Sequence, residues 1–418
     1  MGLVQTANLR EGMVLAGDVL DTSGRLLIAR GTELTPRGIR VLKMWGVIEA
    51  DVEGVGDEEG GSGLGPDLDP DFVAAAERKA RALLPYTNID HPAGKALYRL
   101  CVARLARGKT DPETVARWSR PEEYHPDNTD EGKVRIPVNI VKAVGDSIPL
   151  STLPDVFHQV NEVLLRPSSS AQEIAEVIEK DTNLSARILR IVNSAFYNFP
   201  SRIDKISRAV TIMGTRQMAT LASGINCLKI FQMIPSRVVD MKSFWEHSLL
   251  CGLGARLLGG YKNIQNTERL FVAGMLHDMG LLALYNRLPD VACLIIEKAR
   301  SEFRPLHEVE KEVLGLDHAE LAHILMKRWR FPLSLETIIR YHHSPLRSPN
   351  TLEAAIVHLA DMIAIAAGSG FSGERRVPPL EAEVWDLLGI SPCTIPVVAD
   401  QALRQLDEIF HYFLYDAP

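Results

Sequence analysis

The chain has few cysteines and no long apolar run. Five cysteines occur among 418 residues, at positions 101, 227, 251, 293 and 393, and none belongs to a CxxC pair. An odd number without paired spacing predicts reduced core thiols and no disulfide framework. The first residues contain no basic region followed by an apolar one, and no uncharged apolar run approaches the ~20 residues that span a bilayer. We therefore expect a soluble, cytoplasmic protein without a signal peptide or membrane segment.

The chain also lacks an excess of positive charge. It has 46 Lys and Arg against 53 Asp and Glu, which gives a net charge of -7. This balance argues against general binding of a phosphate backbone, so nucleic acid is not an expected partner. Hydrophobic residues make up 46% and charged residues 24%, as in soluble globular proteins, although aromatic residues are only 6%. The length is sufficient for two or three domains.

Residues 1–53 are predicted to form a small β-rich module. The predicted elements are strands at 13–21 and 25–32 with a turn at Ser23–Gly24, a helix at 36–45 that ends before Gly46, and a strand at 47–53. Residues 54–70 are rich in glycine and acidic residues and predict a flexible linker. Residues 71–133 are expected to be a helical connector, with helical patterns over 71–108 and a polar second connection at 109–133.

From 134 to 418 the pattern predicts one helical domain with a helical extension at its C-terminal end. Ser170 and Glu173 have the spacing of a capping box at a helix start, and Ile174, Val177 and Ile178 supply an apolar face. No strand-like alternation occurs after position 150. The chain is therefore expected to be mainly α.

Two further helices are predicted from start and stop signals. Asn350 is expected to cap a helix that carries Glu353 three residues later and ends at Gly368. Pro396 lies near the start of a last amphipathic helix.

The most informative feature is His277–Asp278 within the apolar segment LFVAGMLHDMGLLALYN. A carboxylate without a partner in such a helix would cost several kcal/mol, so a positive group must compensate it. Further imidazoles and carboxylates occur in other helical segments, at His247, His318, His342, His343 and Asp361. Convergence of such groups on one buried point is what a metal site requires.

Each candidate also has a plainer interpretation. His277 and Asp278 could form a buried hydrogen-bonded pair without a metal. Asp361 could face solvent, His247 could lie on a helix surface beside Glu246, and the paired histidines before a proline could be exposed. His323 and His358 are expected to be structural.

Two other polar segments are expected to have structural roles. Asn193 is predicted to be a structural hydrogen-bonding residue rather than part of a catalytic pair with Ser194. The arginines of FPSRIDKISR, at positions 199–208, are expected on a solvated basic face, with binding of phosphate or a partner as the alternative.

Residues from about 138 to 340 resemble the HDOD domain, a helical relative of the HD-domain phosphohydrolases. The resemblance is carried by SIPLSTLPDVFHQVNEVL, by IVNSAFY followed by ISRAVTIMG, and by the segments around FVAGMLHDMGLLAL, DHAELAHILMKRW and LETIIRYHHSP. Residues 8–53 are similar to the small module that precedes some HD-GYP cyclic-dinucleotide phosphodiesterases. Together the two resemblances imply bacterial signalling.

The resemblance also implies a metal-ligand set. The H…HD…D ligands of HD enzymes correspond to His247, His277, Asp278 and Asp361. The additional histidines of HD-GYP enzymes correspond to His318, His342 and His343. Two departures argue against phosphodiesterase activity: Leu281 stands where the HDxGK pattern has lysine, and no GYP stretch follows the paired histidines.

Two functions follow as hypotheses. The first is a non-enzymatic regulatory protein that binds signalling proteins, or a nucleotide, with a divalent metal as a structural element. The second is a metal-dependent phosphohydrolase that acts on a nucleotide or cyclic dinucleotide. A mixed imidazole and carboxylate set suits iron, manganese, zinc or nickel. The sequence also suggests that Leu281→Lys would matter only if phosphate bound beside it.

Overall fold

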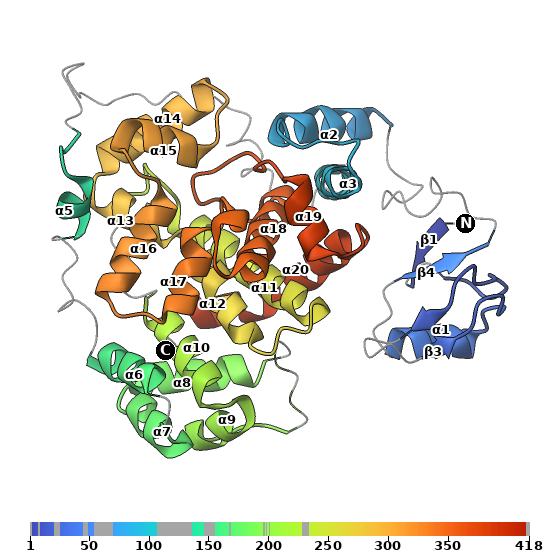
Figure 1. The fold of residues 1–418 in the computed structure, drawn as a ribbon, viewed down its shortest axis with the longest axis horizontal. Coiled ribbons are helices and arrows are strands. Elements are labelled where there is room, and N and C mark those ends of the chain that lie inside the picture. The colour runs from blue at the N-terminus through green and yellow to red at the C-terminus, as the bar shows by residue number, and fades with distance from the viewer. Residues whose placement is uncertain are drawn as a thin grey trace.

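In a computed structural model of the chain, the described residues are 2–6, 9–20, 26–44, 49–53, 70–106, 136–145, 155–166, 169–194, 197, 199, 201–227 and 234–414. Figure 1 shows them as a ribbon. Several predictions fall on residues outside the described ranges. These are the connection at 109–133, the Ser23–Gly24 turn, Gly46, and the predicted linker, of which only Pro70 is described.

The described residues before position 54 form a small unit of strands and one helix. Its elements are β1 (Gly2–Gln5), β2 (Val19–Leu20), β3 (Leu26–Ile28), α1 (Pro36–Met44) and β4 (Glu49–Val52). β1 pairs with β4, and β2 pairs with β3, both antiparallel. The unit has its own hydrophobic core, formed by Val4, Leu9, Leu15, Val19, Leu34, Leu42, Ala50 and Val52.

Two details of this unit differ from the sequence-based prediction. β1 was not predicted, because its partner β4 lies at the other end of the unit and pairing over that separation leaves no local signal. The strand expected over 13–21 is regular only at Val19–Leu20, while Val14 and Leu15 make single bridges to Glu33 and Val52. Gly17, between these stretches, lacks a side chain that could pack in a strand.

After position 69 the described residues contain helices and no strand, which confirms the mainly α fold. The helices are α2 (Pro70–Leu83), α3 (Pro92–Ala106), α5 (Ile140–Gly145), α6 (Asp155–Leu165), α7 (Ala171–Glu179), α8 (Thr182–Val192), α9 (Ile206–Met213), α10 (Thr215–Cys227), α11 (Met241–Tyr261), α12 (Thr267–Leu276), α13 (Met279–Arg287), α14 (Pro289–Ser301), α15 (Leu306–Leu314), α16 (His318–Arg328), α17 (Leu333–Arg340), the 3-10 helix η3 (Pro345–Arg347), α18 (Thr351–Ala367), α19 (Ala382–Leu388) and α20 (Thr394–Leu414). Within the described part of the chain, no helix combines the length and the apolar character needed to cross a membrane.

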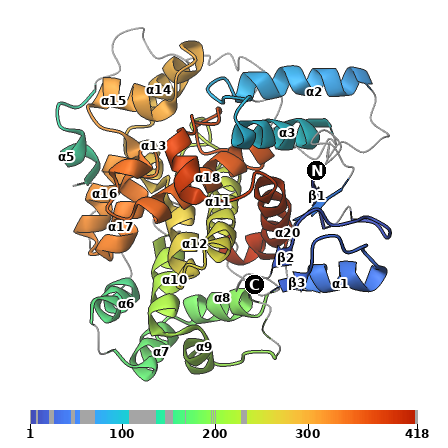
Figure 2. The same ribbon diagram turned by 45° about the vertical axis from the view of Figure 1, so that its right-hand side comes forward.

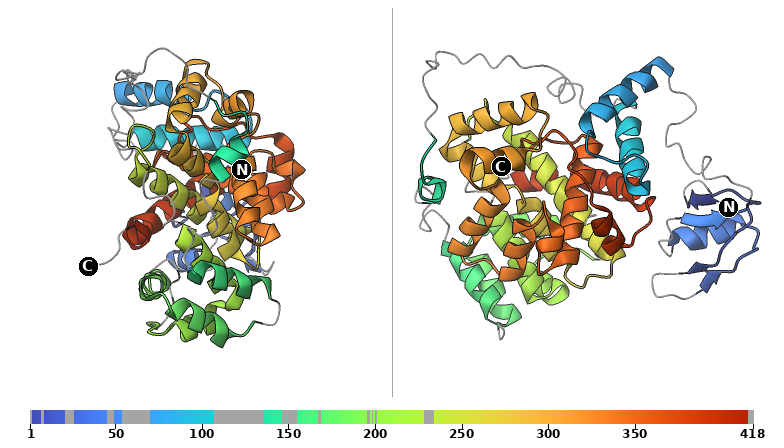
Figure 3. Two further views of the ribbon diagram at one scale, coloured as in Figure 1. Left: turned by 90° about the vertical axis from the view of Figure 1, so that its left-hand side faces the viewer. Right: turned by 45° about the horizontal axis from the view of Figure 1, so that its top comes forward.

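α11, α12 and α18 form the centre of the helical domain (Figures 1 and 2). Every residue of α18 from Ala354 to Ala367 is buried, as expected for a helix that is apolar on all sides. The helices α6 to α10 gather at one end (Figure 3). α3 packs against α18 and α20, so the helix pair α2–α3 shares the core of this domain.

The predicted helix ends are confirmed, with one correction. Ser170 and Glu173 form a reciprocal capping box at the start of α7, and Gly368 ends α18 in the left-handed conformation with φ of 67°. Asn350 occupies the expected position before α18, but its side chain does not cap the helix. Its amide nitrogen instead donates to the hydroxyl oxygen of Thr337, 2.7 Å away, because α17 packs against α18 at this point.

α11 and α12 approach each other closely at two glycines. A Cβ atom added to Gly274 would lie 2.7 Å from Cα of Gly252, and one added to Gly252 would lie 2.6 Å from the carbonyl oxygen of Phe271. These are backbone atoms, so a side chain here would push the helices apart. The contact thereby determines how near His247 on α11 lies to His277 at the end of α12.

We expect Gly274→Ala to lower the free energy of unfolding by about 1–3 kcal/mol through overpacking. Gly260→Ala in α11 is the matched control, because no atom lies within 4 Å of its added Cβ. Alanine in a helix is favoured over glycine by roughly 0.5–1 kcal/mol, so this variant should be slightly more stable than wild type. Denaturant unfolding measures both, and equal stability of the two variants would contradict the role of the contact.

Candidate metal centre

All seven predicted candidates lie in one cluster, and all are buried except His343, which is half-buried. His247 comes from α11 and Asp361 from α18, while His277 and Asp278 join α12 to α13. The others are His318 at the start of α16 and His342 and His343 directly after α17. Two groups of three have ligand atoms within 4.8 Å of one another: His247, His277 and Asp278, and His318, His342 and His343.

Asp278 connects the two groups. Its Oδ2 lies 3.2 Å from Nε2 of His277 and 3.7 Å from Nε2 of His247. Its Oδ1 lies 3.3 Å from Nε2 of His318, in the second group. Asp361 completes the first group, since its Oδ1 is 3.2 Å from Nε2 of His247 and 3.6 Å from Nε2 of His277.

The rings of the second group are equally close. Nε2 of His343 lies 2.8 Å from Nε2 of His318. The ring centres of His342 and His343 are 3.8 Å apart, and His342 is also 5.1 Å from the ring centre of His277. His342 therefore contacts both groups.

The opposite ring nitrogens hold three of the histidines in place. Nδ1 of His277 donates to the carbonyl of Gly274, and Nδ1 of His342 donates to that of Ile339, each over 2.7 Å. Nδ1 of His318 donates over 2.7 Å to the carboxylate of Glu310. Such bonds leave Nε2 available to a metal ion once any proton on it is lost, which is how metal-ligating histidines are usually held.

The Nε2 atoms of three histidines converge without a well-aligned hydrogen bond. Among the described residues, Nε2 of His247, His277 and His342 are buried and make no hydrogen bond of good geometry, although carboxylate oxygens lie 3.2 Å from the first two. Buried polar groups are normally satisfied, so this arrangement is one that a bound cation would complete. Together with two carboxylates, this donor set fits a divalent metal ion.

The carboxylate of Asp278 and the neighbouring imidazoles of His277 and His318 stabilise each other's charged forms. Burial opposes ionisation of Asp278, but His277 and His318 outweigh it and hold the pKa of this carboxyl well below its usual value. Burial also disfavours the charged form of His277, yet Asp278 outweighs it and keeps the pKa of His277 well above the ordinary range. His318 has a raised pKa as well, because Glu310 and Asp278 outweigh its burial.

The paired histidines after α17, His342 and His343, have lowered pKa values. Burial, together with the neighbouring His277 and His318, lowers the pKa of His342 to about 3. Burial and the adjacent imidazoles also hold the pKa of His343 well below its usual value. Both are therefore neutral near pH 7, in the form that binds metal ions.

The plainer interpretations of several candidates are wrong. His247 is 3% exposed and Asp361 is 4% exposed, so neither lies on a solvated helix face, and His342 is fully buried. Glu246 belongs to neither group of ligands, and its carboxylate lies 3.8 Å from the ammonium of Lys242.

His323 and His358 contribute no atom to either group. Nδ1 of His323 lies 2.7 Å from the carboxylate of Glu336. Nε2 of His358 lies 3.3 Å from the carbonyl oxygen of Pro379.

Sequence reasoning missed two residues beside the cluster. Glu310 in α15 is fully buried and accepts hydrogen bonds from both the backbone and the ring of His318. His307 stacks on His343 with ring centres 4.2 Å apart. Both lie in LHEVEKEVL, whose amphipathic pattern is that of an ordinary surface helix, so no local signal could have identified them.

The segment after α18 packs against the backbone of α11 at His247. A Cβ added to Gly370, whose φ is +80°, would lie 2.2 Å from the backbone nitrogen of His247. Glu374 ties the segment to α15 by accepting from the backbone N–H of Leu306 at 2.6 Å. Arg376 donates to the carbonyl oxygens of Ala299 and Arg300 at the end of α14, each at 3.1 Å. The segment is thus held against α11, α14 and α15.

Leu281 is buried in α13, with 1% of its surface exposed. A lysine here would place an ammonium group in the hydrophobic core whether or not phosphate were bound. The expectation that Leu281→Lys reports on a phosphate site is therefore wrong.

Residues 150–345 match the HDOD domain family. An uncharacterized protein from Treponema pallidum is 25% identical over 219 residues, which are 51% of this chain and 41% of that protein. The chain thus spans less than half the length of this relative.

Two solved structures share the fold. An HDOD domain protein of unknown function from Geobacter sulfurreducens aligns with a TM-score of 0.53 and 21% identity, over 66% of this chain and 98% of that one. A proposed phosphohydrolase from Shewanella amazonensis aligns with a TM-score of 0.51 and 23% identity, over 65% and 97%.

We expect Leu281→Lys to destabilise the protein by several kcal/mol, because the ammonium group has no polar partner in the core. Leu281→Met conserves volume and should cost less than ~1.5 kcal/mol. Urea unfolding of both variants, with and without inorganic phosphate, measures this. A lysine variant as stable as wild type, or one rescued by phosphate, would contradict the burial of this position.

Proposed function

Residues 150–345 form an HDOD domain, and we propose that the chain is a non-enzymatic regulatory protein in which a bound divalent metal ion holds the helices together. The observation that carries this proposal is the enclosure of the cluster. The side chains of His247, His277 and His318 are at most 3% exposed, and those of Asp278 and Asp361 are 6% exposed. Structural metal sites are closed, whereas catalytic sites keep one position open to water or substrate.

The ligands proposed for the ion are His247, His277, Asp278 and Asp361, with His318, His342 and His343 on the other side of Asp278. They come from α11, the α12–α13 junction, the start of α16, the end of α17, and α18. An ion bound there would hold these five parts of the chain together at one point, whereas each contact between two helices joins only two of them. Its binding free energy would then add to the free energy of folding.

The donor set does not select one metal. Imidazole with carboxylate suits iron, manganese, zinc and nickel, and thiolate is absent from both groups of ligands. In this proposal the domain binds signalling proteins or a nucleotide and transmits an input from the N-terminal unit. Bacterial signalling and a cytoplasmic location remain part of the proposal.

A metal-dependent phosphohydrolase is the second candidate, and one observation favours it. The two oxygens of Asp278 face different histidine groups, which is the arrangement of a carboxylate shared by two ions. A metal pair supplies Lewis-acid polarisation and an activated water when bound. The burial of the cluster and the apolar Leu281 argue against access for a phosphodiester.

The first test is the metal content of protein purified without chelator or nickel affinity resin. We expect about one ion per chain by mass spectrometry, lost in Asp278→Ala because that carboxylate contacts both groups. Asp290→Ala is the matched control, since its carboxylate pairs with Arg237 outside the cluster and metal should be retained. Removal of the metal by chelation should lower the unfolding temperature of wild type and of Asp290→Ala, but not that of Asp278→Ala, which has already lost the ion.

The metal count distinguishes the candidates. Two ions per chain together with hydrolysis of a phosphodiester would replace the regulatory proposal by the hydrolase. Absence of metal from wild type, with no binding on addition of iron, manganese, zinc or nickel, would reject both.

A second test uses the protons in the cluster. Metal replaces the protons that His277 and His318 carry at pH 7 in the metal-free state, because the pKa of each is raised. Loading the chelated protein should therefore release about one to two protons, and affinity should rise with pH until both imidazoles are neutral. His342 should release none, since its pKa is about 3.

Calorimetric titration in buffers of different ionisation enthalpy measures the released protons. The Asp278→Ala variant serves as the baseline for binding elsewhere on the chain. Metal binding at pH 7 without any proton release would contradict the charged state of these two histidines.

A further inference from the structure

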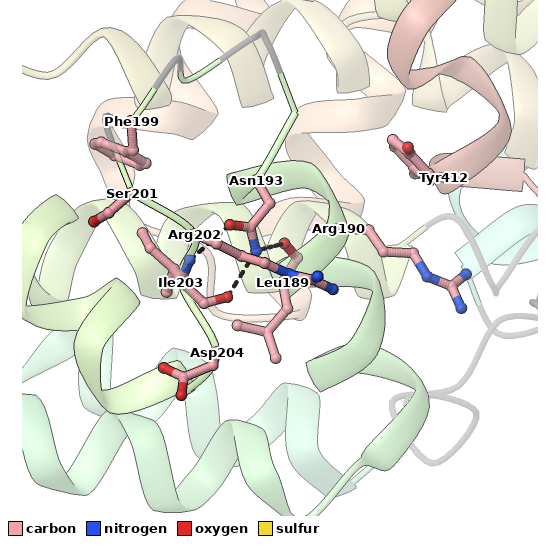
Figure 4. A pocket seen from close by; sticks show the side chains of 9 residues that line it. All are labelled: Leu189, Arg190, Asn193, Phe199, Ser201, Arg202, Ile203, Asp204 and Tyr412. Atoms are coloured by element: carbon pink, nitrogen blue, oxygen red, sulfur yellow. Dashed lines mark hydrogen bonds between the residues drawn. The ribbon is translucent and has the colours of Figure 1, made fainter.

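A second feature of the domain is a hollow at the end formed by α6 to α10, where α8 meets α20 (Figure 4). Its volume is about 820 Å³. The lining residues are Leu189, Arg190, Asn193, Phe199, Ser201, Arg202, Ile203, Asp204 and Tyr412. None of the seven metal candidates is among them, so the hollow is a separate feature.

Asn193 gives the hollow a rigid base. Its amide nitrogen donates to the carbonyl oxygens of Leu189 and Ile203, each at 2.7 Å. Its amide oxygen accepts from the backbone N–H of Ile203, also at 2.7 Å. This confirms that Asn193 is a structural hydrogen-bonding residue, and it fixes the segment that carries Ser201 and Arg202 against α8.

Two arginines in the lining have no partner. Arg190 and Arg202 are exposed, and neither forms an ion pair or hydrogen bond within the part of the chain that the structure describes. Figure 4 shows their side chains extending toward the same side of the hollow. With Asp204 as the one carboxylate in the lining, the hollow is locally positive in a chain of net charge -7.

Aromatic surfaces complete the lining. Phe199 is held by stacking on Tyr197, with ring centres 5.7 Å apart and planes 11° from parallel. The hydroxyl of Tyr197 donates to Glu268 of α12 over 2.6 Å, and Glu268 in turn accepts from Arg256 of α11 over 3.1 Å. Tyr412 comes from α20. The aromatic part of the lining is thus anchored to the centre of the domain.

We propose that this hollow binds a nucleotide, with Arg190 and Arg202 on its phosphate and the aromatic side chains beside its base. Guanidinium groups match phosphate oxygens in charge and geometry, and aromatic rings stack on bases. The volume lies within the ~300–1,000 Å³ of small-molecule sites. An acidic peptide is less suited, because among the described residues the lining offers no strand edge to an extended chain. This inference rests on the proposed regulatory function, which includes binding of a nucleotide, and assigns that binding to one site; it does not depend on the metal centre.

The test is calorimetric titration of the full chain with adenosine, guanosine, cytidine and uridine 5′-monophosphates. We expect at least one to bind, and Arg190→Gln and Arg202→Gln each to weaken it about tenfold by removing a charge-assisted hydrogen bond. Arg99→Gln is the matched control, since Arg99 is an exposed helical arginine outside the hollow. Binding should persist in the wild-type chain after its metal has been removed by chelation, which excludes phosphate capture by a bound metal ion.

Parallel titrations use inorganic phosphate, the free nucleoside and a glutamate-rich peptide. Weaker binding of phosphate and of nucleoside than of the nucleotide supports the proposal. It is overturned if no monophosphate binds at millimolar concentration, if the arginine variants bind as wild type does, or if only the peptide binds. Loss of binding on chelation, with no effect of the arginine substitutions, would also overturn it, by assigning the nucleotide to the metal centre.

Discussion

The buried carboxylate of Asp278 is the constraint on which the arrangement of the helical domain depends. A charge at 4% exposure must be compensated within a few ångströms, and the compensating groups come from α11, α12 and α16. The close contact of Gly252 with Gly274 brings two of these helices together. Glu310 and the carbonyls of Gly274 and Ile339 then orient the imidazoles. Helix packing and electrostatic attraction therefore both bring His247 and His277 to Asp278.

Enclosure of this cluster separates it from the solvent-facing parts of the domain. The segment after α18 lies on the backbone of His247, and Arg376 ties it to α14. The hollow beside α8 has the opposite character, because its arginines are exposed and form no ion pair with any residue that the structure describes. Both regions are attached to α11 and α12: His247 and Arg256 share one helix, while Glu268 lies in the helix that ends at His277. A ligand in the hollow would therefore contact a segment bonded to the helices that carry the cluster.

Local signals in the sequence predicted much of the helical domain correctly. The capping box at Ser170 and the stop at Gly368 are confirmed, because capping depends on residues within one helical turn. Asn193 is also confirmed as a structural residue, although its partner Ile203 could not be named. The seven candidate positions were named from imidazoles and carboxylates in apolar helical segments, the family resemblance implied the same set, and the structure brings all of them together. Their role as metal ligands stays a prediction.

The sequence by itself determined which chemistry is available: imidazoles and carboxylates inside apolar helices, and the periodicity that makes those segments helical. Only the tertiary structure decided which of these groups meet and which are enclosed. It turned the side chain of Asn350 toward Thr337, buried Leu281, and brought Glu310 and His307 to the histidines. The reason is that helical periodicity specifies which face of a helix is buried. The partner that covers this face comes from a distant segment and depends on shape and close packing across the whole core.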